Sequence, residues 1–303
     1  MAHIYIFSPS SAVRDKAAFR RGVKRLQALG HEVEIDEAAL VSHMRFAGDD
    51  ATRIAAIGRA AASGANVALI SRGGYGLTRI LPDLPYKAIA KAIDSGTQFV
   101  GLSDFTAFNQ AVLARTGRIS WQGPALGEDF GPEGEPDDIL QACFDDLLAE
   151  QGEGAGWQRP KNEATLQARV KDGVLWGGNL SVLCSLLGSP YFPQIDKGVL
   201  FLEDVGEHPY RVERMLTQLL HADVLARQKA IVLGQFTNYK RVPTHDKGFK
   251  LQTVVDWLRS QLKVPVLTGL PFGHVPTKVL LPVGARVDLV TEGRDALIVW
   301  GHI

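Results

Sequence analysis

The stretch QFVGLSDFTAF, residues 98–108, runs from a short apolar segment through a tight turn into a helical pattern. Comparable apolar runs stand at residues 3–7 (HIYIF) and 66–71 (NVALIS), and helical patterns at 12–29 and 51–63 separate them. Strand and helix in alternation favour a mostly parallel sheet that is covered on both faces. The sequence therefore predicts an α/β fold for this half of the chain, with ligands at the carboxyl ends of the strands.

A shift in composition divides the chain into two predicted domains. Residues 151–163, QGEGAGWQRPKNE, are rich in Gly and polar side chains and lack apolar periodicity. We expect this segment to link an N-terminal domain, residues 1–150, to a C-terminal domain, residues 164–303. The second part carries the apolar runs GVLFLE, KAIVLG and ALIVW and helical patterns at 208–222 and 250–262. This pattern predicts a smaller α+β domain.

Composition limits the function. At 303 residues and 46% hydrophobic content the chain can build two domains with cores. Lys and Arg total 33, as do Asp and Glu, so binding to nucleic acid is not expected. Cys143 and Cys184 show no metal-ligand spacing, which favours a reducing compartment and no metal site. Without a basic leader or an apolar run of about 18 residues, we expect a soluble, cytoplasmic protein with no membrane span.

Ser103 can be a helix cap or a nucleophile. Ser103 or Asp104 could accept hydrogen bonds from the first turn of a helix whose buried stripe is Phe105, Phe108 and Val112. A serine at a tight strand-to-helix turn is also held at the sheet edge, where the next backbone N–H can stabilise an oxyanion. Because Phe105 replaces the second glycine of G-x-S-x-G, the lipase-type elbow is not predicted.

A glycine-rich loop follows the predicted strand at 66–71. The stretch SRGGYGLTRIL places Gly73, Gly74 and Gly76 where the backbone can approach a ligand and offer N–H groups to an anion. It lacks the Lys and Ser/Thr of a P-loop and does not match G-x-G-x-x-G, so a nucleotide site is not favoured. A plain tight turn remains the alternative.

A serine nucleophile needs a base, and the base needs an orienting acceptor. His274, in a Gly- and Pro-rich loop, is the preferred base, and His208 remains a competitor. Glu203 and Glu207 share a short segment, and either could be the acceptor. We prefer Glu203 because it closes a strand-like run, which is a rigid platform, whereas Glu207 could serve the start of the next helix.

Five segments carry a resemblance to a known family. They are RGGYG (72–76), GLSDFTA (101–107), LWGGNLSVLCSLLGSPY (175–191), LFLEDVGEHPYRVERMLTQL (200–219) and GLPFGHVPTKVLLPVGA (269–285). In this order and spacing the chain resembles, over nearly its whole length, the LD-carboxypeptidases of bacterial peptidoglycan recycling.

The resemblance implies a serine peptidase whose Ser-His-Glu triad maps onto Ser103, His274 and Glu203. It also implies a Rossmann-like N-terminal domain, a swivelling β/α C-terminal domain, a homodimer, and no metal or organic cofactor. The implied substrate is the cytoplasmic murein tetrapeptide, free or sugar-linked, which loses its terminal D-alanine by cleavage of an L,D bond. Because Ser103 belongs to the first predicted domain and its partners to the second, we expect the site in a cleft between the two domains.

Further roles follow from the same interpretation. The oxyanion would accept hydrogen bonds from the backbone N–H groups of Asp104 and Gly74. Asn179 either caps the helix after it or hydrogen-bonds the peptide substrate. Arg72 either pairs with the terminal D-alanine carboxylate or is a solvent-exposed loop charge.

Two other functions stay open on sequence grounds. One is a hydrolase from the same superfamily that confers immunity by opening acyl-sulfamoyl or peptidyl-nucleotide antibiotics such as microcin C. That activity would use an aromatic platform for the nucleobase, for which Trp121 and Trp176 are the candidates. The other is a two-domain protein that closes on an amino acid or a peptide without chemistry.

Overall fold

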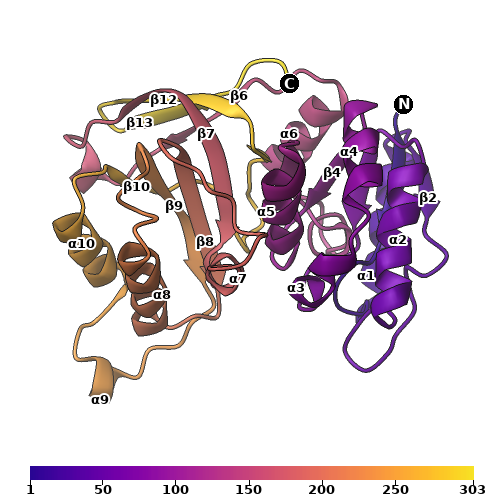
Figure 1. The fold of residues 1–303 in the computed structure, drawn as a ribbon, viewed down its shortest axis with the longest axis horizontal. Coiled ribbons are helices and arrows are strands. Elements are labelled where there is room, and N and C mark those ends of the chain that lie inside the picture. The colour runs from indigo at the N-terminus through magenta and orange to yellow at the C-terminus, as the bar shows by residue number, and fades with distance from the viewer. The chain divides into compact units, whose positions relative to one another are not determined.

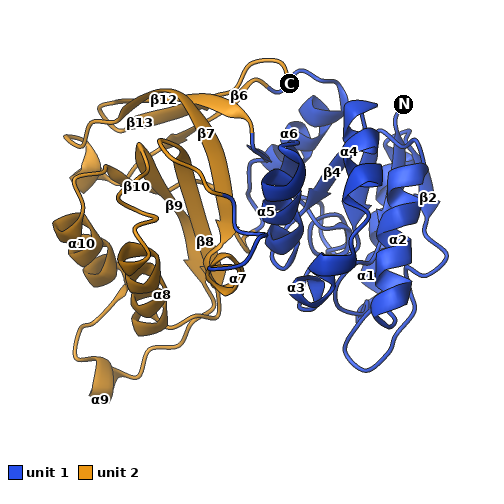
Figure 2. Cartoon of the chain, viewed as in Figure 1, with its two compact units in different colours: residues 1–152, 188–193, 276–284 blue, residues 153–187, 194–275, 285–303 orange.

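The chain forms two compact units, each assembled from more than one stretch of sequence (Figure 2). The computed structural model describes residues 1–303. The first unit comprises Met1–Gly152, Gly188–Pro193 and Pro276–Gly284, and the second comprises Glu153–Leu187, Gln194–Val275 and Ala285–Ile303. Two short segments from the C-terminal half therefore belong to the first unit.

The segment expected to be a linker, 151–163, contains regular structure of the second unit. Strand β6 (Gly154–Gln158) and a 3₁₀ turn, η3 (Lys161–Glu163), lie within it. Ala155 and Trp157 are buried, whereas the residues between and beside them are exposed. This alternation is typical of a half-buried strand, and the interleaved glycines conceal it in the sequence.

A six-stranded sheet forms the centre of the first unit (Figure 1), in the order β11-β5-β4-β3-β1-β2. Its strands are β1 (His3–Phe7), β2 (Glu32–Ile35), β3 (Val67–Ile70), β4 (Gln98–Gly101), β5 (Ser120–Gln122) and β11 (Leu281–Val283). All neighbours are parallel except β11, which pairs antiparallel with β5. The predicted α/β fold with a mostly parallel sheet is confirmed.

The predicted helical patterns at 12–29 and 51–63 correspond to two of the helices of the first unit. The helices of this unit are α1 (Lys16–Ala28), α2 (Asp50–Ala62), α3 (Leu77–Ile80), α4 (Tyr86–Asp94), α5 (Phe105–Thr116) and α6 (Asp138–Leu148), with the short elements η1 (Leu81–Asp83) and η2 (Leu126–Phe130). The Asp15 carboxylate caps α1 by accepting the Ala18 N–H at 2.8 Å. On α5, the predicted stripe of Phe105, Phe108 and Val112 is fully buried.

The second unit is built on a seven-stranded mixed sheet, in the order β10-β9-β8-β7-β12-β13-β6. Its remaining strands are β7 (Arg169–Asn179), β8 (Val199–Val205), β9 (Ala230–Thr237), β10 (Val266–Thr268), β12 (Arg286–Glu292) and β13 (Asp295–Val299). Strands β7 to β10 are parallel, and β12, β13 and β6 are antiparallel. The helices are α7 (Leu180–Ser185), α8 (Pro209–His221), α9 (Pro243–Asp246) and α10 (Leu251–Gln261).

In each unit the candidate residues lie at the carboxyl ends of parallel strands, where ligands bind in such sheets. Ser103 follows β4, and the glycine loop, residues 73–76, follows β3. In the second unit Asn179 ends β7, beside Glu203 of the neighbouring strand β8. No helix in this structure could serve as a transmembrane span.

Candidate active site

Ser103 has an unusual backbone conformation. It lies between β4 and α5 with φ of 68°, in the left-handed region that residues with a Cβ rarely adopt. The turn is closed by hydrogen bonds from Phe105 N–H to the Leu102 carbonyl (3.2 Å) and from Thr106 N–H to the Ser103 carbonyl (2.9 Å). Such strain costs about 1–3 kcal/mol and is concentrated at functional sites. The conformation favours a functional role for this serine.

The capping interpretation of this turn is wrong. Helix α5 begins at Phe105 without a side-chain capping bond. The carboxylate of Asp104, which precedes it, is buried and instead accepts hydrogen bonds from the Ser10 hydroxyl and from the Leu77 N–H at 2.9 Å. Asp104 is therefore bonded to other segments of the first unit, not to the helix that it precedes.

The glycine loop lies against the Ser103 turn. A Cβ on Gly73 would be 2.6 Å from the Cβ of Ser103, a distance that real Cβ atoms do not tolerate. Gly74 has φ of 111°, and a Cβ there would be 2.2 Å from the Ser11 hydroxyl oxygen. Only glycine allows this backbone to come so close to both serines.

In the second unit, Glu203 and His274 form a close pair. The His274 Nδ1 atom lies 2.8 Å from Oε2 of Glu203, whose side chain is fully buried. Gly273 has φ of 137°, and a Cβ there would be 3.1 Å from the same carboxylate oxygen. A carboxylate at Nδ1 stabilises the tautomer with its proton on that nitrogen and leaves Nε2 unprotonated. His274 is thus oriented as a general base would be.

The competing residues have other partners. Glu207 is partly exposed and lies 3.7 Å from the Arg211 guanidinium. His208 caps α8 by accepting the Tyr210 N–H at 3.4 Å, and its Nε2 lies 3.1 Å from Asp246. Both residues belong to the start of α8 and its surroundings.

Asn179 caps a helix and contacts the candidate acid. Its side-chain oxygen accepts the Val182 N–H at 3.1 Å, so the capping alternative is confirmed. Its amide nitrogen donates to Glu203 (3.1 Å) and to Asp204 (3.0 Å). These bonds hold the Glu203 carboxylate in place, a role that the sequence did not reveal.

Asp204 is a buried carboxyl that the sequence analysis missed. Strand β8 is buried on both faces over residues 199–204, so the consecutive acids Glu203 and Asp204 are both buried. Burial raises the pKa of Asp204 to about 6, and the neighbouring charge of Glu203 acts in the same direction. The only signal in the sequence was a pair of acids ending an apolar run.

The raised pKa of Asp204 predicts a pH-dependent stability. A carboxyl whose pKa is higher folded than unfolded, where it is about 3.9, makes the folded state lose stability as pH rises from 4 through 6. We expect Asp204→Asn to become more stable relative to the wild type by roughly 2 kcal/mol between pH 4 and pH 7. Urea denaturation of both proteins at pH 4 and pH 7 measures this change.

The exposed Asp196 provides the matched control for Asp204, because its side chain is 65% exposed. Asp196→Asn should give a difference from the wild type that hardly changes with pH. If the difference between Asp204→Asn and the wild type were equally independent of pH, the assignment of a raised pKa to Asp204 would be wrong.

Arg72 borders a pocket of about 290 Å³ in the first unit, together with Arg14 and Glu128. It donates one hydrogen bond to the Ala12 carbonyl at 3.1 Å. Burial lowers the pKa of the Arg72 guanidinium; Glu128 opposes this shift, whereas Arg14 and Arg45 add to it. Such a group gains from an anionic ligand, since a carboxylate would reduce the repulsion among the cations.

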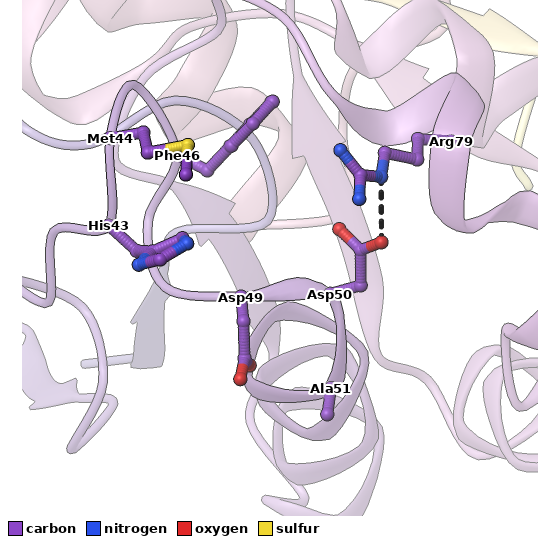
Figure 3. A pocket seen from close by; sticks show the side chains of 7 residues that line it. All are labelled: His43, Met44, Phe46, Asp49, Asp50, Ala51 and Arg79. Carbon is purple, nitrogen blue, oxygen red and sulfur yellow. Dashed lines mark hydrogen bonds and ion pairs between the residues drawn. The ribbon is translucent and has the colours of Figure 1, made fainter.

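A second pocket in the first unit, of about 330 Å³, contains none of the predicted site residues. Figure 3 shows the Asp50 carboxylate facing Arg79, with which it pairs at 2.7 Å. Asp49, also in this pocket, caps α2 by accepting the Thr52 N–H at 2.8 Å. These polar groups already have hydrogen-bond or ion-pair partners within the protein, so they give no indication of a ligand in this pocket.

The two tryptophans considered as nucleobase platforms are buried. Trp176 is inaccessible to solvent, and its indole N–H donates to Gln228 at 3.0 Å. Trp121 is 4% exposed, with its indole N–H bonded to Gln98. Neither ring offers a face on which a base could stack.

Comparisons with known proteins agree across both units. The model of the LD-carboxypeptidase N-terminal domain matches residues 4–123, and that of the LD-carboxypeptidase C-terminal domain matches residues 172–289. The crystal structure of a muramoyltetrapeptide carboxypeptidase from Oxalobacter formigenes has a TM-score of 0.88 and 38% identity, and the match covers 99% of this chain and 98% of that one.

Two curated relatives carry different activities in their names. The murein tetrapeptide carboxypeptidase of Pseudomonas aeruginosa is 31% identical over 74% of this chain and 71% of its own. The microcin C7 self-immunity protein of Escherichia coli is 28% identical over 75% of this chain and 71% of its own. The sequence left two enzymatic activities open, and this chain is similar to a relative named for each of them.

Proposed function

Because the chain belongs to the LD-carboxypeptidase family, we propose that it is a serine carboxypeptidase that releases the terminal D-alanine of murein tetrapeptides. The observation that carries the proposal is the buried Glu203 carboxylate 2.8 Å from His274 Nδ1, which prepares an imidazole to accept a proton. The strained turn at Ser103 supplies a candidate nucleophile. The names of the relatives from Pseudomonas aeruginosa and Oxalobacter formigenes support the substrate class.

The proposed reaction has two stages. Ser103 Oγ attacks the carbonyl carbon that precedes D-alanine, while Nε2 of His274 takes the hydroxyl proton. The tetrahedral intermediate then collapses, the C–N bond breaks, and His274 returns the proton to the leaving amine of D-alanine. Water, deprotonated by His274, hydrolyses the remaining ester and releases the tripeptide and Ser103.

We assign the stabilisation of the charges that form during the reaction to groups near the carboxyl ends of strands in the two sheets. Glu203 stabilises the imidazolium that forms during attack, and Asn179 keeps that carboxylate oriented through its 3.1 Å hydrogen bond. The oxyanion accepts hydrogen bonds from the backbone N–H groups of Asp104 and Gly74. Losing one such donor typically costs about 3 kcal/mol of barrier.

Arg72 is assigned to the terminal carboxylate of the substrate. Its pocket is lined by two cations, Arg72 and Arg14, and by two acids, Glu128 and Asp15, of which Glu128 opposes the lowering of the pKa of Arg72. A planar guanidinium can bind both oxygens of a carboxylate, and this geometry would select peptides with a free C-terminus.

The biological setting is proposed from family membership and composition. We assign the reaction to recycling of murein peptides in the cytoplasm, carried out by a homodimer without a metal or organic cofactor. The two free cysteines, Cys143 and Cys184, are compatible with a reducing compartment.

Mass spectrometry of a purified tetrapeptide tests the function. Incubation with the protein should shorten the peptide by one alanine residue and release free D-alanine. A tetrapeptide ending in L-alanine is the matched control and should stay intact. An acyl-sulfamoyl adenosine in a parallel reaction tests the immunity-type hydrolase, which the burial of Trp121 and Trp176 disfavours. An intact D-alanine tetrapeptide would contradict the proposal, and the absence of any product would favour a binding protein.

A further inference from the structure

The side chain of Asp104 has no part in the proposed chemistry, which uses only its backbone N–H. It is 2% exposed and stands immediately after Ser103. Its carboxylate accepts hydrogen bonds from the Ser10 hydroxyl and from the Leu77 N–H at 2.9 Å. A buried carboxylate is costly unless donors surround it, so these contacts must be maintained together.

The second donor, the Leu77 N–H, belongs to the peptide group that follows Gly76 at the end of the glycine loop. On the opposite side of the same peptide group, Nη1 of the fully buried Arg53 donates to the Gly76 carbonyl at 2.8 Å. A Cβ on Gly76 would lie 2.7 Å from that guanidinium nitrogen, so the residue must be glycine. The end of the loop is thus held between a buried cation and the carboxylate of Asp104.

The beginning of the glycine loop is fixed separately. Ser11 donates its N–H to the Gly73 carbonyl at 3.4 Å and accepts the Tyr75 N–H on its hydroxyl at 3.0 Å. Between these anchors stands Gly74, the proposed second oxyanion donor. Asp104 differs from Ser11 and Arg53 because it also belongs to the Ser103 turn and provides the first proposed donor from its own backbone.

We propose that the Asp104 side chain is a positioning residue that couples the two oxyanion donors. By accepting the Leu77 N–H at the end of the glycine loop, it holds the loop that carries Gly74 in register with the turn that carries Ser103. The catalytic part of this inference rests on the proposed function, whereas the contacts of Asp104 do not depend on it. An oxyanion site works only when its donors are fixed before the charge develops, and a displacement of about 1 Å can cost a factor of 100 in rate.

Burial explains why a carboxylate can hold the loop so firmly. Loss of hydration raises the pKa of Asp104 above its ordinary value, although the donors and the positive charge of Arg53 oppose this shift. The ionised form thus depends on the hydrogen bonds from Ser10 and Leu77, and any movement of the loop away from Asp104 would leave a buried charge with fewer partners. An uncharged side chain would bind the same two donors less strongly.

The test measures catalysis per competent active site in Asp104→Ala, Asp104→Asn and Ser10→Ala. Fluorophosphonate titration counts the reactive sites, so that a misfolded fraction does not affect the rate constants. We expect Asp104→Ala to lower kcat by about 100-fold, with KM changed by less than about threefold. Asp104→Asn, whose amide oxygen can still accept, should lose about tenfold, and Ser10→Ala less than that.

Asp36→Asn is the matched control. Asp36 is another buried carboxylate of the first unit, which accepts from the Tyr5 hydroxyl at 2.6 Å and from the Arg59 guanidinium at 2.7 Å. It has no contact with the glycine loop in this structure. Asp36→Asn should lower the melting temperature and leave kcat per titrated site unchanged. If Asp104 had only a structural role, its variants would show this same pattern.

Hydrogen exchange separates failure of this inference from failure of the proposed function. The amides of residues 72–81 should exchange faster in Asp104→Ala than in the wild type or in Asp36→Asn. Unchanged exchange together with an unchanged kcat per site would overturn the positioning role. A wild type that neither reacts with the probe nor releases D-alanine would end the proposed function, and the exchange rates alone would then decide whether Asp104 holds the loop. If Asp104→Ala does not fold, Asp104→Asn and Ser10→Ala decide.

Discussion

Replacing Ser103 by alanine should lower the release of D-alanine by about four orders of magnitude or more. The variant lacks only the hydroxyl group. The oxyanion donors and the binding of the substrate would account for the small activity that remains. Because alanine and serine tolerate the left-handed conformation at φ of 68° about equally, the melting temperature should stay within a few degrees of the wild type. Turnover kinetics and thermal denaturation measure the two quantities.

Ser103→Gly provides a second test of the nucleophile. It removes the hydroxyl too and should be equally inactive, but glycine relieves the backbone strain at φ of 68°. We expect this variant to melt above Ser103→Ala, although the greater freedom of glycine in the unfolded chain reduces the gain. Substantial D-alanine release by either variant would rule out Ser103 as the nucleophile.

Glu203→Gln should reduce kcat by about three to four orders of magnitude. Glutamine can place an N–H against Nδ1 of His274, which then favours the wrong tautomer and gives no charge to stabilise the imidazolium. Both effects should be large because Glu203 is fully buried and only 2.8 Å from the imidazole. Steady-state kinetics with the D-alanine tetrapeptide measure the loss.

Glu207→Gln is the comparison that decides between the two acids. It removes a partly exposed contact with Arg211 at 3.7 Å, so kcat should change by less than about threefold. A greater loss of kcat in Glu207→Gln than in Glu203→Gln would reverse the assignment of the acid. Circular dichroism of both variants verifies that the differences do not come from unfolding.

The architecture of the first unit could be predicted because its elements are signalled locally. The apolar runs at 3–7, 66–71 and 98–102 became β1, β3 and β4, shortened by at most one residue at either end. Strand β2 carries the sequence EVEI and is mostly exposed at the sheet edge, so it lacks the apolar signal. Strand β11 has three residues and pairs with β5, far away in sequence, which no local pattern can encode.

The candidate site was predictable to the extent that its residues stand in recognisable turns. The positions of Ser103, Glu203 and His274 followed from loops and strand ends together with the resemblance. The contact between Asn179 and Asp204 could not be foreseen, because it depends on the parallel pairing of β7 with β8. The sequence suggested that Asp104 could cap helix α5. In the structure its buried carboxylate instead accepts a hydrogen bond from Leu77, which is distant in the sequence.

Strand β11 also has a consequence for how the protein can be divided. Leu281 and Val283 pair with Gln122 and Ser120 of β5, so the C-terminal part of the chain supplies the border strand of the N-terminal sheet. A fragment truncated after residue 152 would expose the unpaired N–H and C=O groups of β5, a template on which other molecules can aggregate. Expression of the N-terminal portion as an autonomous piece would need this short strand grafted back, for example through an engineered tether.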